Sequence, residues 1–244
     1  MINNVFIWGS KSYALLVDDI VKRIKKDINL KYIKPKNNKY KTAFIFDPYS
    51  KKARYNLEGY FFNNLSNFNK NIKKCKSFVV CIGENHGKAR YSISVFLEKY
   101  GLKPLTLISK YTHIGNKTRI GKGVVAMPNS YVNSFSEIGD YSILNSSSNI
   151  EHECRIGKGT HIMSGACVGG RCVIEDFATI GTNATILPNI KIGSGSYIGA
   201  GSVVTKDVKK NTIIIGVPGK YYKKINNTVD HQIFKKILRI KQNG

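Results

Sequence analysis

The residues best suited to chemistry lie close together, between positions 145 and 161 of this 244-residue chain. His152 is flanked by Glu151 and Glu153, and a second histidine, His161, follows in the same polar stretch. A carboxylate beside an imidazole can hold the orientation of the ring and stabilise its protonated form. We therefore predict that His152 is a general base that works near neutral pH.

A zinc centre is the competing interpretation of these histidines. Catalytic zinc needs three protein ligands and an open position. Only His152 and His161 are suitably placed, because His113 lies far earlier in the chain. The spacing therefore predicts no metal. The remaining histidines, His86 and His231, have no acidic or amide context of this kind.

The element that must position these residues repeats every six residues. The first residue of each hexad is apolar, and the fifth is small or β-branched. The apolar positions are Ile108, Ile114, Ile120, Ala126, Val132, Ile138, Leu144, Ile150, Ile156, Ile162, Val168, Ile174, Ile180, Ile186, Ile192, Ile198 and Val204. This period is typical of a parallel β-helix, in which three hexads form one triangular coil of about eighteen residues. Cys154 and Cys172 are predicted to be small core residues. The glycine that often follows the first position is predicted to permit the turn geometry.

Residues 1–107 have no hexads and predict a separate α/β domain. Apolar strands are expected at 4–8, 43–46, 78–82 and 104–107, and helices around 15–24 and 93–97. Alternation of this kind favours a small parallel, Rossmann-like sheet, whose ligands bind at the carboxyl ends of the strands. Because only Gly9 remains of a dinucleotide fingerprint, a scaffold domain without ligand stays open. The solenoid is expected over 108–219, and a capping tail over 220–244 with a helix at 232–240.

Composition limits the partners. The net charge is +24, but the basic residues are spread over both halves and no nucleic-acid motif accompanies them. We therefore expect no nucleic-acid partner, although a positive surface would attract anionic substrates. No apolar run approaches the roughly 18 residues of a membrane span. The odd set of five cysteines without a CxxC pair favours a reduced, cytoplasmic location.

Three motifs carry a resemblance to a known family. They are His-Glu-Cys-Arg-Ile-Gly at 152–157 with His161, Gly-Ala-Gly-Ser-Val-Val-Thr-Lys-Asp at 199–207, and Gly-Val-Pro-Gly-Lys at 216–220. Together they resemble the hexapeptide-repeat sugar acyltransferases, which include the sialic acid O-acetyltransferases and the UDP-4-amino-sugar N-acetyltransferases. The resemblance implies a left-handed β-helix, a homotrimer with sites between adjacent solenoids, and acetyl-CoA as the cosubstrate.

The resemblance also implies residue roles. His152 would be the base, Glu153 would support it, and Asn145 would orient the acceptor. Acetyl-CoA would meet His161, Gly170, Gly181, Ala200, Lys206 and Lys220. The nucleotide sugar would meet Gly9, Ser10, Asp47, Gly83 and Asn85, although the first loop, at 8–13, departs from the family pattern.

The predicted activity is direct transfer of an acetyl group from acetyl-CoA to a nucleotide-linked 4-amino-6-deoxy sugar. O-Acetylation of sialic acid or another surface sugar is the alternative, because a histidine base serves an amine and a hydroxyl alike. A trimeric sugar-binding scaffold without turnover is the alternative of another class.

Overall fold

The structure is a computed structural model that describes residues 4–10, 14, 43–52, 59–83 and 85–225. The helices expected around 15–24 and 232–240, and His231, lie outside these residues. Contacts divide the chain into two compact units. Unit 1 comprises Met1–Ile82, Ser92–Leu105 and Val229–Gly244, and unit 2 comprises Gly83–Tyr91 and Thr106–Thr228.

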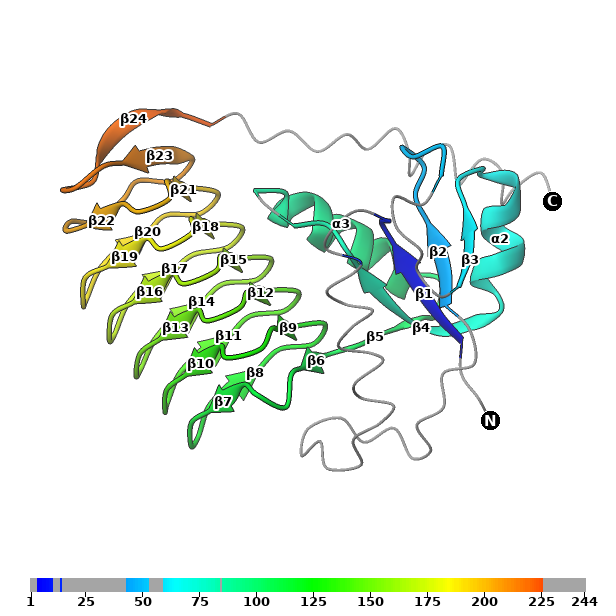
Figure 1. Ribbon diagram of the computed structural model, residues 1–244, viewed down its shortest axis with the longest axis horizontal. Coiled ribbons are helices and arrows are strands. Elements are labelled where there is room, and N and C mark those ends of the chain that lie inside the picture. The colour runs from blue at the N-terminus through cyan, green and yellow to red at the C-terminus, as the bar shows by residue number, and fades with distance from the viewer. Residues whose placement is uncertain (1–3, 11–13, 15–42, 53–58, 84, 226–244) are drawn as a thin grey trace. The chain divides into compact units, whose positions relative to one another are not determined.

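Unit 1 contains a parallel five-stranded sheet with the order β3-β2-β1-β4-β5 (Figure 1). The strands are β1 (Asn4–Trp8), β2 (Ala43–Phe46), β3 (Tyr60–Phe62), β4 (Cys75–Val80) and β5 (Lys103–Pro104). This order is that of the first five strands of a Rossmann sheet, whose ligands bind where the order reverses, between β1 and β4. The helices are α2 (Ser66–Ile72) and α3 (Gly87–Glu98). Neither β3 nor α2 was expected from the sequence.

Aromatic side chains fill the core of this sheet. The rings of Trp8 and Phe46 meet edge to face with their centroids 4.9 Å apart, and Phe46 and Phe68 lie 5.0 Å apart. Aromatic pairs in this geometry contribute about 0.5–1.5 kcal/mol beyond the apolar area that they bury. The strands therefore bury nearly continuous apolar runs, as is typical of a parallel sheet.

Unit 2 is a parallel β-helix with three sheets. Sheet 1 contains β6 (Leu107–Ile108), β9 (Val125–Ala126), β12 (Ile143–Leu144), β15 (His161–Ile162), β18 (Thr179–Ile180), β21 (Tyr197–Ile198), β23 (Thr212–Ile215) and β24 (Lys220–Lys224). Sheet 2 contains β7 (His113–Ile114), β10 (Tyr131–Val132), β13 (Asn149–Ile150), β16 (Cys167–Val168), β19 (Thr185–Ile186) and β22 (Val203–Val204). Sheet 3 contains β8 (Arg119–Ile120), β11 (Glu137–Ile138), β14 (Arg155–Ile156), β17 (Val173–Ile174) and β20 (Lys191–Ile192).

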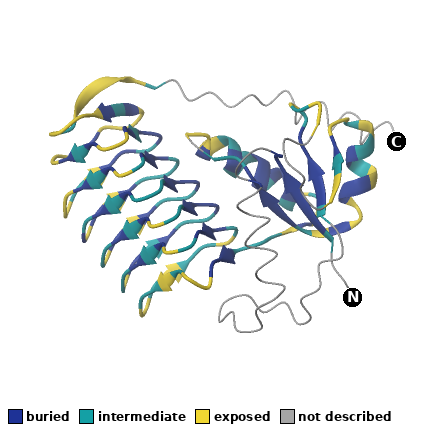
Figure 2. Cartoon of the chain, viewed as in Figure 1, coloured by how far each residue is buried: buried dark blue, intermediate teal, exposed yellow. Residues whose placement is uncertain are grey.

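The register confirms the predicted coil of three hexads. Tyr131 pairs with Asn149, and Ile143 with His161, so each residue faces its equivalent three hexads later. The first residues of the hexads form one buried column, and Cys154 and Cys172 are buried within it as predicted (Figure 2). Ile114 and Ile120 are only partly buried, because the first coil is covered on one side only.

The turns correct one expectation about glycine. From Lys117 to Gly201, the fourth residue of every hexad has a positive φ, between 53° and 68°. Most of these residues are not glycine. The glycine in the second position, such as Gly157, instead permits close packing of successive coils, since an added Cβ there would lie 2.5 Å from the backbone nitrogen of Asp176.

The last coil ends in a hairpin, in which β23 pairs antiparallel with β24. All five residues of β24 are exposed. Within the described residues, no helix is long and apolar enough to cross a membrane.

Candidate functional site

The His152 corner comprises residues 151–154, which connect β13 to β14. Hydrogen bonds to the neighbouring coils fix its backbone. The nitrogen of Glu153 donates to the carbonyl of Ser134 at 3.1 Å, and the nitrogen of Arg171 donates to the carbonyl of His152 at 2.9 Å. The imidazole therefore projects from a corner that is held by the coil on either side.

The imidazole and a carboxylate meet at this corner as predicted. Nδ1 of His152 lies 2.9 Å from Oε2 of Glu153, and the two side chains are 45% and 52% exposed. Glu151 does not take part, because its carboxylate accepts hydrogen bonds from the amides of Asn133 and Asn149. When Nδ1 carries the proton, Nε2 is free to accept a proton from a substrate. The pair has the geometry of an oriented general base.

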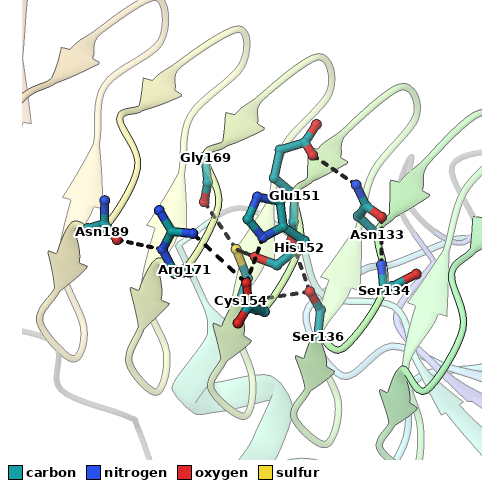
Figure 3. Close-up of polar contacts among 10 residues, drawn as sticks. Asn133, Ser134, Ser136, Glu151, His152, Cys154, Gly169, Arg171 and Asn189 are labelled. Atoms are coloured by element: carbon teal, nitrogen blue, oxygen red, sulfur yellow. Dashed lines mark hydrogen bonds and ion pairs between the residues drawn. The ribbon is translucent and has the colours of Figure 1, made fainter.

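Two side chains that the sequence reasoning missed extend this pair. Nη1 of Arg171 lies 4.0 Å from Oε2 of Glu153, and Nε of Arg171 donates to Oδ1 of Asn189 at 2.9 Å. Glu153, Arg171 and Asn189 each occupy the fourth, positive-φ position of a hexad, one coil apart. Figure 3 shows Arg171 and Asn189 on neighbouring coils beside His152. Their spacing of three hexads was a signal in the sequence, since it stacks side chains on one corner.

Gly170 also belongs to this corner. A Cβ placed on Gly170 would lie 2.7 Å from Nε2 of His152, so the ring lies directly over the glycine. The sequence reasoning placed Gly170 with Gly181 and Ala200 along the pantetheine arm. The structure separates them, because Gly170 follows a strand of sheet 2 whereas Gly181 and Ala200 follow strands of sheet 1.

Cys154 adjoins the pair but faces the core. Its side chain is fully buried, and its Sγ lies 3.1 Å from the carbonyl oxygen of Gly169. Its hydrogen bond to Cys172, followed by burial, raises the pKa of the Cys154 thiol far above the ordinary value. A thiol in this state is not a nucleophile.

His161 occupies a different side of the coil, the His161 face, formed by β12 and β15 of sheet 1 with the turn at Gly83. The side chain of His161 is only 3% exposed. A Cβ placed on Gly83 would lie 3.8 Å from Cε1 of His161, so the turn lies next to the imidazole. Gly83, predicted on the acceptor side, therefore contacts His161, predicted on the donor side. Asn85, predicted with Gly83, is exposed in the same turn.

Asn145 lies nearer this face than the His152 corner. It directly follows β12, whose Ile143 pairs with His161 of β15. Its Oδ1 accepts a hydrogen bond from the nitrogen of Ser146 at 2.9 Å. Asn145 and His152 therefore stand at successive corners of the coil and not in one cluster.

The remaining predicted residues are spread over both units. Gly181 is buried and Ala200 exposed at the corner after sheet 1, and Lys206 and Lys220 are exposed near the last coil. In unit 1, Ser10 donates to Oδ2 of Asp47 from its nitrogen at 3.0 Å and from its hydroxyl at 2.7 Å. A Cβ placed on Gly9 would lie 2.7 Å from the carbonyl oxygen of Cys81. Gly9, Ser10 and Asp47 thus meet at the carboxyl ends of β1 and β2, where Ser10 and Asp47 are buried.

Among the described residues, no three histidine, cysteine, aspartate or glutamate side chains could hold an ion together. His113 instead stacks on Tyr131 with the ring centroids 4.6 Å apart.

The bacterial transferase hexapeptide family (six repeats) matches residues 171–206. No curated protein matches the chain by sequence.

Several solved structures are similar over nearly their whole length. A variant of perosamine N-acetyltransferase from Caulobacter crescentus, in complex with CoA and GDP-perosamine, is 22% identical with a TM-score of 0.77, over 92% of this chain and 99% of that chain. The acetyltransferase domain of PglB from Neisseria gonorrhoeae FA1090 is 20% identical with a TM-score of 0.77, over 90% of this chain and 100% of that chain. WeeI from Acinetobacter baumannii AYE is 24% identical with a TM-score of 0.74, over 89% of this chain and 99% of that chain.

The chain therefore carries the bacterial transferase hexapeptide repeat and shares its fold with these proteins, in agreement with the resemblance that its motifs predict.

Proposed function

We propose that the protein is a sugar N-acetyltransferase that transfers an acetyl group from acetyl-CoA to a nucleotide-linked 4-amino-6-deoxy sugar. The contact between His152 and Glu153 carries the proposal, because an exposed, oriented imidazole has no evident use in the solenoid itself. The likeness to perosamine N-acetyltransferase, whose structure contains CoA and GDP-perosamine, supports the choice of both substrates. The left-handed sense of the helix is part of the same inference.

The transfer needs one proton carrier. Nε2 of His152 accepts a proton from the acceptor amine as its nitrogen bonds to the thioester carbonyl carbon. The tetrahedral intermediate then breaks its C–S bond, and the imidazolium returns the proton to the CoA sulfur. Glu153 stabilises the imidazolium between these steps. A base of this kind contributes about 10²- to 10⁴-fold.

No covalent acetyl-enzyme is required. Both substrates bind together, and the transfer gains most from holding amine and thioester in contact. The raised pKa and complete burial of Cys154 argue against a cysteine nucleophile beside the base.

We further propose that each active site is assembled from two chains of a homotrimer. His152 and Glu153 lie at the corner between sheets 2 and 3, whereas His161 and Gly83 lie on sheet 1. One small thioester cannot contact both places on a single coil. In a closed ring, the corner of one solenoid can face sheet 1 of its neighbour.

A thiol-release assay tests the activity. Purified protein is given acetyl-CoA with a panel of nucleotide-linked amino sugars, such as GDP-perosamine, and with sialic acid. Release of free CoA with an amino sugar, and N-acetyl product by mass spectrometry, supports the proposal. Release with sialic acid alone would favour O-acetylation, and no release with any sugar would favour a binding scaffold.

A further inference from the structure

Arg90 makes a buried connection between two segments of unit 2 that are distant in sequence. Arg90 is only 3% exposed, although it lies in the first turn of α3. Nε donates to the carbonyl of Tyr141 at 2.9 Å, and Nη2 donates to the carbonyls of Gly159 and Thr160 at 2.8 and 2.9 Å. These oxygens belong to two successive coils, so one guanidinium holds the start of α3 to both.

Two further contacts support the same attachment. Gly87 approaches the carbonyl oxygen of Gly159 so closely that an added Cβ would collide with it. The ring of Tyr91 meets Tyr141 and Phe177 edge to face, with centroids 5.7 and 5.6 Å apart. Backbone contact, hydrogen bonds and aromatic packing therefore fix the residues from Gly87 to Tyr91 on the solenoid.

The consequence lies at Gly83 and His161. Thr160, whose carbonyl accepts from Arg90, directly precedes His161. The attached segment also places Gly83 in contact with that imidazole. The same anchor thus controls the position of a turn predicted on the acceptor side relative to a histidine predicted on the donor side.

We propose that Arg90 is a positioning residue, which holds residues 85–87 on the solenoid and Gly83 next to His161 so that the nucleotide sugar is presented to the thioester. The inference rests on the proposed acetyl transfer. Arginine suits this role because its planar fork offers several donors in fixed directions and remains charged when buried. A lysine would reach fewer of the carbonyls, and methionine none.

Two variants test the anchor, with the acceptor identified in the sugar panel as the varied substrate. Arg90→Met should raise KM for that acceptor at least about tenfold, because the turn is no longer held. The Kd for acetyl-CoA, measured by calorimetry, should change less than about twofold. Arg90→Lys should recover part of the loss. Arg119→Met is the matched control, because Arg119 is an exposed arginine that pairs with Glu137 on sheet 3, and its kinetics should equal those of the wild type.

Hydrogen exchange gives a readout that needs no activity. Amides of residues 85–91 should exchange faster in Arg90→Met, while those of β12 and β15 stay protected. Should Arg90→Met fail to fold, Gly87→Ala disturbs the same attachment through its clash with Gly159 and should raise the acceptor KM in the same way.

The outcomes separate the two proposals. A wild type that acetylates no sugar contradicts the proposed function, yet faster exchange in Arg90→Met would still support the anchor. An active wild type with an unchanged acceptor KM and unchanged exchange in the folded variants would overturn the role of Arg90.

Discussion

His152 and His161 occupy opposite environments in the solenoid. His152 projects from a corner, nearly half exposed, with a carboxylate at 2.9 Å. His161 is buried on sheet 1 next to the turn at Gly83. The same repeat presents both residues, but His152 projects into solvent and His161 is buried by its own chain.

This difference shows how a rigid solenoid can divide the parts of one site. The stacked coils fix each side chain by register, so neither histidine can move towards the other without breaking the ladder. In the proposed two-chain site, the corner with His152 and the face with His161 come from different chains. Variants at the two places should therefore fail in different ways.

The largest effect is expected from His152→Ala. Turnover should fall at least about a hundredfold, because the proton acceptor is lost, while affinity for acetyl-CoA stays similar. Steady-state kinetics and calorimetry measure the two quantities. His113→Ala, which removes the other solenoid histidine stacked on Tyr131, should keep wild-type turnover. Unchanged turnover in His152→Ala would remove this residue from the mechanism.

A smaller loss is expected from Gly170→Ala. The new Cβ would meet Nε2 of His152 at 2.7 Å, so the ring must turn away from Glu153. Turnover should fall about tenfold without loss of the fold. In a His152→Ala background the same change should add nothing, because the ring it displaces is absent. An equal added loss in that background would show that Gly170 acts elsewhere.

Arg171→Met should lower turnover less than Gly170→Ala does. The Glu153 carboxylate would lose one of its two neighbours, but both side chains are more than half exposed, so their ion pair is weak. We expect turnover to fall about threefold at unchanged acetyl-CoA affinity. Asn189→Ala, which frees the Arg171 guanidinium, should cause a smaller change in the same direction. A loss in Asn189→Ala that exceeds that in Arg171→Met would contradict this order.

The smallest effect is expected at Glu175, whose ion pair with Lys191 has no chemistry assigned to it. Hydrogen bonds from Lys191 and from the backbone of Ser194 hold the pKa of Glu175 below its ordinary value. The stability it adds is therefore complete above the unfolded pKa and is lost as the pH falls through the lower folded one. Glu175→Gln should lower the free energy of unfolding by about 0.5 kcal/mol at pH 7, with no effect on turnover.

Denaturant titrations at pH 7 and pH 2.5 check this sign. The difference between wild type and Glu175→Gln should shrink at the acid pH, because protonation removes the charge of the carboxylate. If the difference in free energy of unfolding grows on acidification, the stated direction of the Glu175 pKa shift is wrong.

The sequence predicts most of the solenoid because its signal is repeated. Each hexad repeats an apolar first residue and a small or β-branched fifth residue, so the core column and the coil of three hexads follow from periodicity alone. The β1 and β2 strands were predicted from apolar runs. β3 was missed because three residues are too few to show a pattern, and α2 was missed because most of its residues are polar. Glycine was assigned to the turns, whereas coil-to-coil contact is what requires it.

The site was predictable only where neighbours in sequence interact. His152 and Glu153 are adjacent, so their contact could be anticipated. The contact of His161 with Gly83 and the three carbonyls bound by Arg90 depend on how distant segments meet, which no local pattern records. The contact of Gly170 with His152 follows from the stacking of coils, whereas the resemblance names Gly170 only together with Gly181 and Ala200.

Subunit complementation tests the two-chain site most directly. His152→Ala and His161→Ala proteins are first assayed alone to establish that each has lost activity. They are then mixed, dissociated and reassembled, and acetyl transfer is measured. If the base of one chain serves the His161 face of its neighbour, random mixing in a closed ring restores roughly a quarter of the wild-type sites. If each chain contains its own complete site, the mixture remains as inactive as its components, and the account fails.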